Sequence, residues 1–217
     1  MSEPRGNYRI AAAVLAGGSS TRMGRPKENM IIKNDGRTFL DKMCDEVNAC
    51  YGKSISGRYI SVRKEQKISR EGYTVIEDGY DGIGPLGGLI SVLRQARAEG
   101  MDAVLMLAVD MILYNKKEIE GICSAYEGED ILFARTEGKR IQPLASVYST
   151  GMIDRAVMQA ETGNYRLLSL LEAEGVLYGY FDASSAAFYC NVNSPGDIGE
   201  ADLLFHNRTD TANCKII

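Results

Sequence analysis

The chain has 217 residues, of which 45% are hydrophobic and 25% are charged, a composition typical of an ordinary globular protein. Its 25 lysines and arginines against 29 aspartates and glutamates give a net charge of −4, so no overall basic field favours nucleic acid. No apolar stretch approaches the roughly 20 residues of a spanning helix and the polar start lacks a signal-peptide core, so we expect a cytoplasmic protein without a membrane partner.

Strands and helices are predicted to alternate along the chain. The predicted strands, which are short apolar runs, cover residues 10–15, 58–62, 73–76, 103–109, 131–135, 144–148, 176–181 and 188–192. The predicted helices, which show helical spacing or capping residues, cover residues 38–52, 86–100, 116–126, 164–175 with Asn164 as cap, and a last segment that starts at Ser194 and Pro195. The alternation favours a single three-layer α/β domain with a mostly parallel central sheet, with its core at about residues 8–205 and a tail at 206–217.

The first predicted strand runs into a glycine-rich loop that ends at Lys27. Gly17 and Gly18 have no Cβ, so the backbone there can approach a ligand closely. Arg22 and Lys27 bring two positive charges to the same loop. A bare backbone beside two cations suits a polyphosphate, which we expect to bind locally at this loop.

Asp110 follows the most continuous apolar run of the chain, residues 103–109, which is typical of a strand buried on both faces. In an open parallel sheet, ligands bind beyond the carboxyl ends of the strands, where Asp110 would lie near the glycine loop. Mg²⁺ prefers one or two carboxylates together with phosphate oxygens and water, so Asp110 is a candidate metal ligand. The alternative is an aspartate that only begins the next loop.

Asp78 and a second glycine cluster follow another predicted strand. Asp78 could bind a sugar hydroxyl, a base edge or a metal-bound water. Residues 82–88 contain the G-x-G-x-x-G pattern, but they do not follow the first strand directly and Pro85 interrupts them, which argues against a dinucleotide-binding unit. We predict instead a tight turn at Gly84 and a helix N-terminus near Leu86 that faces negative charge.

Cysteines and histidines do not form a recognisable site. The five cysteines are odd in number and none forms a Cys-x-x-Cys pair, so we expect reduced thiols rather than zinc ligands or disulfides. His206 is the only histidine, which makes a serine or cysteine nucleophile with a histidine base improbable.

Five motifs in the same order resemble the molybdenum cofactor guanylyltransferases, within the nucleotidyltransferase superfamily that has a Rossmann-like, glycosyltransferase-A-like sheet. They are Leu15-Ala16-Gly17-Gly18-x-x-x-Arg22-Met23-Gly24-x-x-Lys27, Gly84-Pro85-Leu86-Gly87-Gly88, Val109-Asp110, Gln142-Pro143-Leu144 and Asn191-Val192-Asn193-Ser194-Pro195. The first motif indicates the superfamily, whereas the last favours this family.

The resemblance implies transfer of GMP from GTP to molybdopterin with Mg²⁺, which gives the guanine dinucleotide cofactor and pyrophosphate. It implies nucleotide contacts from Leu15, Ala16, Gly17, Gly18, Lys27, Asp78, Gly84 and Asp110, of which Asp110 would also hold the metal. It implies that Arg22, Lys27 and Asp110 are catalytic and that the acceptor contacts Gln142, Arg166, Asn191 and Asn193. It further implies a partner protein that handles the cofactor.

One departure from the family and two alternatives remain at this stage. The strand that ends at Arg63 lacks the asparagine that the family often uses for nucleotide contact. The side chains of the first loop do not reveal the base, so a cytidylyltransferase acting on molybdopterin or another phosphorylated small molecule is an alternative. The other alternative is a non-catalytic cofactor-binding protein, which the joint presence of Arg22, Lys27 and Asp110 argues against.

Overall fold

The structure is a computed structural model that describes residues 8–17, 26–33, 35–193 and 197. Gly18, Arg22, the predicted last helix from Ser194 and the tail at 206–217 lie outside these residues.

A seven-stranded sheet forms the centre of the molecule, in the order β3-β2-β1-β4-β6-β5-β7. The strands are β1 (Ile10–Leu15), β2 (Gly57–Val62), β3 (Thr74–Glu77), β4 (Ala103–Ala108), β5 (Ile131–Thr136), β6 (Arg140–Ser149) and β7 (Tyr178–Asp182). Only β6 is reversed: it pairs antiparallel with β4 and β5, whereas the other neighbouring pairs are parallel. The prediction of a single α/β domain with a mostly parallel sheet is confirmed.

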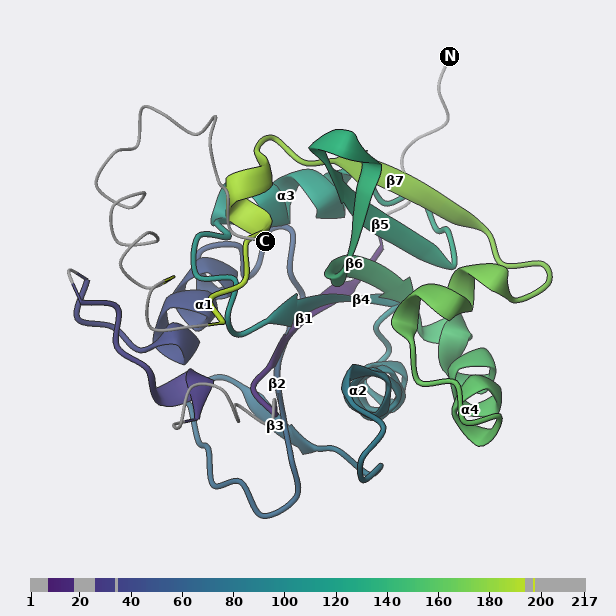
Figure 1. Cartoon of the computed structure of the whole chain (residues 1–217), viewed down its shortest axis with the longest axis horizontal. Helices are drawn as coiled ribbons and strands as arrows, with labels where there is room; N and C mark the ends of the chain where they lie inside the picture. The colour runs from purple at the N-terminus through teal and green to yellow at the C-terminus, as the bar shows by residue number, and fades with distance from the viewer. Residues whose placement is uncertain (1–7, 18–25, 34, 194–196, 198–217) are drawn as a thin grey trace.

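Helices cover both faces of the sheet (Figure 1). The α-helices of the described residues are α1 (Phe39–Asn48), α2 (Pro85–Ala98), α3 (Lys116–Ala125) and α4 (Ile153–Glu161). Helices α1 and α3 pack on one face, and α2 and α4 on the other, so the domain has three layers. No helix in the described part of the chain is long and apolar enough to span a membrane.

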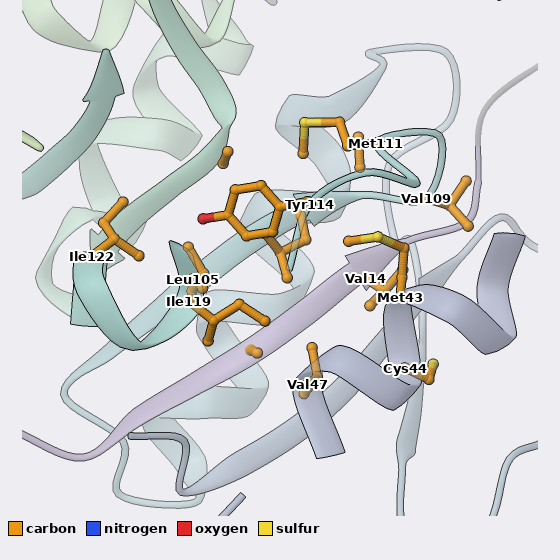
Figure 2. Close-up of a cluster of buried hydrophobic side chains, with 14 of the residues drawn as sticks. Val14, Met43, Cys44, Val47, Leu105, Val109, Met111, Tyr114, Ile119 and Ile122 are labelled. Atoms are coloured by element: carbon orange, nitrogen blue, oxygen red, sulfur yellow. The ribbon is translucent and has the colours of Figure 1, made fainter. Parts of the chain in front are cut away.

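The two cores follow from alternation along the central strands. In β4, Leu105 faces α1 and α3, while Val104 and Met106 face α2 and α4. Figure 2 shows the first of these cores, in which Leu105 lies close to Ile119 of α3 and Met43 projects into the same core from α1. Burial of such a side chain stabilises the fold by about 1.5–3 kcal/mol, so β4 is anchored on both sides and holds Asp110 firmly at its end.

Two helix starts that position the cleft described below agree with the sequence. Thr38 caps α1, because its Oγ1 accepts a hydrogen bond from the backbone N–H of Asp41 at 3.0 Å. Helix α2 begins at Pro85 after Gly84, whose φ of 64° lies in the left-handed region that favours glycine.

Some predicted elements are wrong in the C-terminal half. The helix expected at 164–175 is a 3-10 helix, Leu167–Glu172, and Asn164 does not cap it but accepts a hydrogen bond from the Arg166 amide. The strand expected at 188–192 is instead a 3-10 helix, Ala186–Tyr189, followed by extended chain outside the sheet. Strand β6 begins four residues before the predicted start at 144, and α4 was not predicted.

Candidate active site

A cleft of about 1050 Å³ opens at the edge of the sheet where β1, β2 and β4 end. Because β1 pairs in parallel with both neighbours, Leu15 lies opposite Ser61 and Ala108, and all three residues line the cleft. The Val109 amide donates to the Leu15 carbonyl at 3.2 Å, which extends this pairing beyond the strands. The predicted placement of the first loop and Asp110 at one edge of the sheet is therefore confirmed.

Lys27, Asp110 and Asn193 meet in this cleft although they are far apart in the sequence. The Lys27 ammonium donates to Asp110 Oδ2 at 2.7 Å and to Asn193 Oδ1 at 2.8 Å. The side chains of Lys27 and Asp110 are only 16% and 14% exposed, so their ion pair is screened less than a surface pair. One lysine thus joins the first loop, the end of β4 and the segment at 191–193.

Asp110 has a second oxygen that is available for a ligand. Oδ1 is buried, and no hydrogen bond to it comes from the part of the chain that the structure describes. A buried carboxylate oxygen without a partner is costly, and a hard divalent cation with phosphate and water ligands would compensate it. No cluster of three or more histidine, cysteine or acidic side chains suited to a metal exists among the described residues. Asp110 therefore fits a Mg²⁺ site in which phosphate and water supply most ligands.

The backbone of residues 15–17 forms the wall beside β2. The Ala16 amide donates to the Ser61 carbonyl at 2.9 Å, and the Ala16 side chain is buried. A Cβ on Gly17 would lie 3.1 Å from Arg63 Cγ and 3.2 Å from the Arg63 backbone nitrogen. Glycine at residue 17 thus allows the turn after β2 to pack closely against the backbone, and Gly17 also lines the cleft.

Gln66 ties the turn after β2 to the first loop, and the sequence did not single it out. Its Oε1 accepts from the Arg63 amide at 3.1 Å, and its Nε2 donates to the Ala16 carbonyl at 3.2 Å and to Glu28. Glu28 is 4% exposed and follows Lys27 directly, so this side-chain amide connects both ends of the first loop. Since β2 was predicted to be parallel to β1, its following turn could have been placed at the same edge.

Arg63 and Lys64 line the cleft as well and add two cations to its wall. They follow β2 directly, which ends at Val62. The described lining of the cleft thus combines these three cations, Lys27, Arg63 and Lys64, with five acidic side chains, Glu28, Glu65, Asp78, Asp81 and Asp110.

Asp78 follows β3 directly, where its amide donates to the Val62 carbonyl of β2 at 2.8 Å, and Gly84 precedes α2; both residues line the cleft. Burial raises the pKa of the Asp78 carboxyl, while hydrogen bonds from the Tyr80 amide at 2.9 Å and the Ser91 hydroxyl at 3.5 Å act in the other direction. A Cβ on Gly87 would lie 2.7 Å from Asp78 Oδ1, so glycine in the first turn of α2 allows the carboxylate to approach. Asp78 is thus held where it can contact a bound ligand.

The four predicted acceptor residues do not come together. Asn191 and Asn193 line the cleft, whereas Gln142 and Arg166 do not. Gln142 is half-buried in β6, where its carbonyl accepts from the Ser146 hydroxyl at 2.6 Å. Arg166 is exposed before the 3-10 helix, and its carbonyl accepts from Gln159 at 2.8 Å. In β6 it is Leu144, two residues after Gln142, that reaches the cleft.

Comparison with known proteins identifies a family model and relatives that match this chain. Residues 12–176 match the MobA-like NTP transferase domain. A protein of Rhodopirellula baltica named probable molybdenum cofactor guanylyltransferase is 25% identical over 197 residues, covering 88% of this chain and 90% of the relative. A protein of the same name from Mycobacterium tuberculosis is 27% identical over 168 residues, covering 77% and 82%.

A solved structure has the same fold. Molybdopterin-guanine dinucleotide biosynthesis protein A from Archaeoglobus fulgidus superposes with a TM-score of 0.73 at 19% identity, over 91% of this chain and 99% of that one. The family match covers most of the chain and includes Lys27, Asp78 and Asp110 of the cleft. The chain belongs to the MobA-like NTP transferase family and is a nucleotidyltransferase.

Proposed function

We propose that the chain transfers GMP from GTP to the terminal phosphate of molybdopterin, which yields the guanine dinucleotide cofactor and pyrophosphate. The names of the relatives from Rhodopirellula baltica and Mycobacterium tuberculosis support this choice of substrates. In the proposal, the donor contacts are those predicted from the sequence, and Asn191 and Asn193 form the described part of the acceptor site. Gln142 and Arg166 lie outside the cleft, and the proposal assigns them no contact.

The observation that carries the proposal is the convergence of Lys27, Asp110 and Asn193 at one point of the cleft. Lys27 would contact the triphosphate, and Asp110 would supply the carboxylate ligand of Mg²⁺. Asn193 comes from the other side, where the acceptor would bind. Transfer between two phosphate-bearing substrates requires that the residues for the donor, the metal and the acceptor lie close together.

The reaction requires no strong general base. A phosphate monoester is already anionic at neutral pH, so the acceptor oxygen can attack the α-phosphate of GTP while pyrophosphate leaves. Bound Mg²⁺ would neutralise developing negative charge on the phosphates. Lys27, Arg63 and Lys64 add positive charge on the protein side, and the cleft excludes bulk water from one side of the ligand. Catalysis by placement and charge agrees with a cleft whose described lining contains no histidine.

The test is direct transfer with purified components. The chain is mixed with Mg²⁺, molybdopterin and either GTP or CTP, and pyrophosphate release and the mass of the dinucleotide product are followed. We expect a guanine dinucleotide from GTP and little product from CTP. Preferential use of CTP would replace the guanylyl proposal with the cytidylyl alternative, and nucleotide binding without pyrophosphate release would favour a non-catalytic protein.

A further inference from the structure

Glu118, a buried carboxylate outside the cleft, has a set of contacts that the proposed reaction does not use. It lies in the first turn of α3 and is 2% exposed. Its Oε2 accepts from the Tyr189 hydroxyl at 2.6 Å, and its Oε1 accepts from the Ser184 hydroxyl. A buried charge requires such partners, and hydrogen bonds to a carboxylate are among the strong ones in proteins.

Both partners belong to the segment at residues 184–193, which leads to the cleft. The rings of Tyr189 and Tyr114 pack edge-to-face with their centroids 5.1 Å apart, and both residues are buried. Tyr114 lies in the core beside Leu105 and Ile119 (Figure 2), and its carbonyl accepts from the buried Lys42 of α1 at 2.8 Å. Tyr189 is therefore fixed against the same core that anchors β4.

The segment reaches the cleft two residues after Tyr189, at Asn191. The Val192 amide donates to the Asp110 carbonyl at 3.0 Å, and Asn193 Oδ1 accepts from Lys27 at 2.8 Å. Residues 190–193 belong to no strand or helix, so no ladder of backbone hydrogen bonds sets their position. The position of this wall depends instead on individual contacts, of which the one between Tyr189 and Glu118 joins two buried side chains.

We propose that Glu118 is a positioning residue that holds Asn191 and Asn193 at the cleft and thereby sets the affinity for the phosphorylated acceptor. This role deepens the proposed function and rests on it for the acceptor. Glu118 acts through Tyr189 and Ser184 on the wall that faces Asp110, whereas the first loop is tied separately by Gln66. Loss of a Glu118 contact therefore loosens the acceptor side of the cleft and leaves the donor side in place.

The main test compares two tyrosine-to-phenylalanine variants. Tyr189→Phe removes one buried hydroxyl that contacts Glu118. Tyr126→Phe removes a buried hydroxyl at the end of α3 that donates to the Glu129 carbonyl at 2.9 Å, away from the cleft. We expect Tyr189→Phe to raise the KM for molybdopterin by about tenfold, with the KM for GTP within about twofold of the unmodified chain. Tyr126→Phe should change neither KM.

Hydrogen exchange gives a readout that needs no acceptor. In Tyr189→Phe and in Glu118→Gln, we expect the amides of residues 190–193 to exchange at least about tenfold faster, with β1 and β4 unchanged. Glu118→Gln keeps the shape of the side chain and removes its charge. If Glu118→Gln does not fold, the exchange measurement on Tyr189→Phe alone tests the inference. An exchange rate at 190–193 equal to that of the unmodified chain would overturn the inference, as would a parallel rise in both KM values.

The two proposals fail in different ways. If the unmodified chain does not transfer GMP to molybdopterin, the proposed function is wrong, and the exchange of residues 190–193 alone decides whether Glu118 positions this wall. If transfer occurs but Tyr189→Phe leaves the molybdopterin KM unchanged, the proposed function stands and the role of Glu118 is rejected.

Discussion

At the scale of single residues, the two oxygens of Asp110 have different environments. Oδ2 accepts a hydrogen bond from Lys27, while Oδ1 is buried and receives none from the described residues. One carboxylate can therefore hold a lysine and a metal ion at the same time. An asparagine at this place would keep the shape but lose the charge and one acceptor oxygen.

Asp110→Asn should lower the rate of pyrophosphate release by about 10²–10³, because the proposed Mg²⁺ would lose the carboxylate assigned to it beside Lys27. The rate is measured at saturating GTP and Mg²⁺, together with the thermal unfolding of the variant. Asp182→Asn is the matched control, since Asp182 forms an ion pair with Arg135 outside the cleft. Near-normal turnover of Asp110→Asn would remove Asp110 from the mechanism.

Gln66→Leu should raise the KM for GTP by about tenfold, because it removes the donor to Ala16 and Glu28 that ties the first loop. The side chain keeps a similar volume, so the packing changes little. Gln95→Leu is the control, since Gln95 donates to Glu99 on the surface of α2. A rise in the molybdopterin KM alone would place the function of Gln66 on the acceptor side instead.

At the scale of elements, the start of α1 shows how a few polar contacts fix a helix. The Thr38 hydroxyl donates to Asp41 at 2.7 Å while accepting from the Asp41 amide, and Arg70 forms an ion pair with the same carboxylate. The hydrogen bond from Thr38 is the main cause of a lowered pKa of Asp41, with a further contribution from Arg70. The ionised carboxylate is thus favoured in the folded state.

This lowered pKa predicts how the stability of the fold depends on pH. A carboxyl group with a lowered folded-state pKa contributes stability above its unfolded pKa, and that contribution is lost as pH falls through the folded value. Asp41→Asn should therefore cost roughly 0.5–1 kcal/mol at pH 7, a modest value because the carboxylate is partly exposed. The difference should be smaller at about pH 3 than at pH 7, because the contribution is lost as the pH falls toward the lowered folded-state pKa. Urea unfolding of both chains at the two pH values measures it, and a difference that grows toward low pH would contradict the assignment.

The sequence predicted the central strands well because each is a continuous apolar run of neighbouring residues. Strands β1 and β4 are apolar on both faces, and Thr38 and Gly84 mark helix starts that need only neighbouring residues. Residues 188–192 form an apolar run of the same kind, yet Tyr189 and Val192 are buried against α3 and Asp110 without joining the sheet. Helix α4 was not predicted although Ile153, Ala156, Val157 and Ala160 recur at helical spacing and pack on the same core as α2.

The candidate site was predictable where it follows from strand ends. Lys27 and Asp110 were placed together because both follow parallel neighbouring strands. No local sequence pattern signals the remaining hydrogen bonds, because they join residues distant in sequence. These are the bond from Lys27 to Asn193 and the bonds made by Gln66 and Glu118. For Gln142, the sequence motif predicted the strand correctly but not the residue. Gln142 and Leu144 both belong to β6, and Leu144 is the one that lines the cleft.

At the scale of the whole molecule, two layers of helices hold the cleft walls on one sheet. Each wall is attached to a different strand end, and the sheet order brings β2, β1 and β4 side by side. A ligand that spans the walls should therefore stabilise the entire domain rather than one loop, because unfolding of any wall would release it.

Unfolding temperature should accordingly rise when GTP and Mg²⁺ are added together, and much less with GTP alone or after removal of Mg²⁺ by EDTA. At a concentration of about 100 times Kd, binding adds about 2.7 kcal/mol to the free energy of unfolding. Differential scanning fluorimetry with and without Mg²⁺ makes the measurement. An equal shift with and without the metal would show that Asp110 does not act through a divalent ion.

The contacts of Lys27 also determine when during synthesis the site can form. Lys27 is separated by 83 residues from Asp110 and by 166 from Asn193. Strands β1, β2 and β4 can pair as soon as residue 108 has left the ribosome, but Asn193 emerges much later. The strand ends beneath the proposed nucleotide site are thus synthesised well before the segment that carries Asn193. Under the proposed function, a chain that ends before residue 191 would lack the described acceptor contacts, Asn191 and Asn193, so truncation there should abolish transfer.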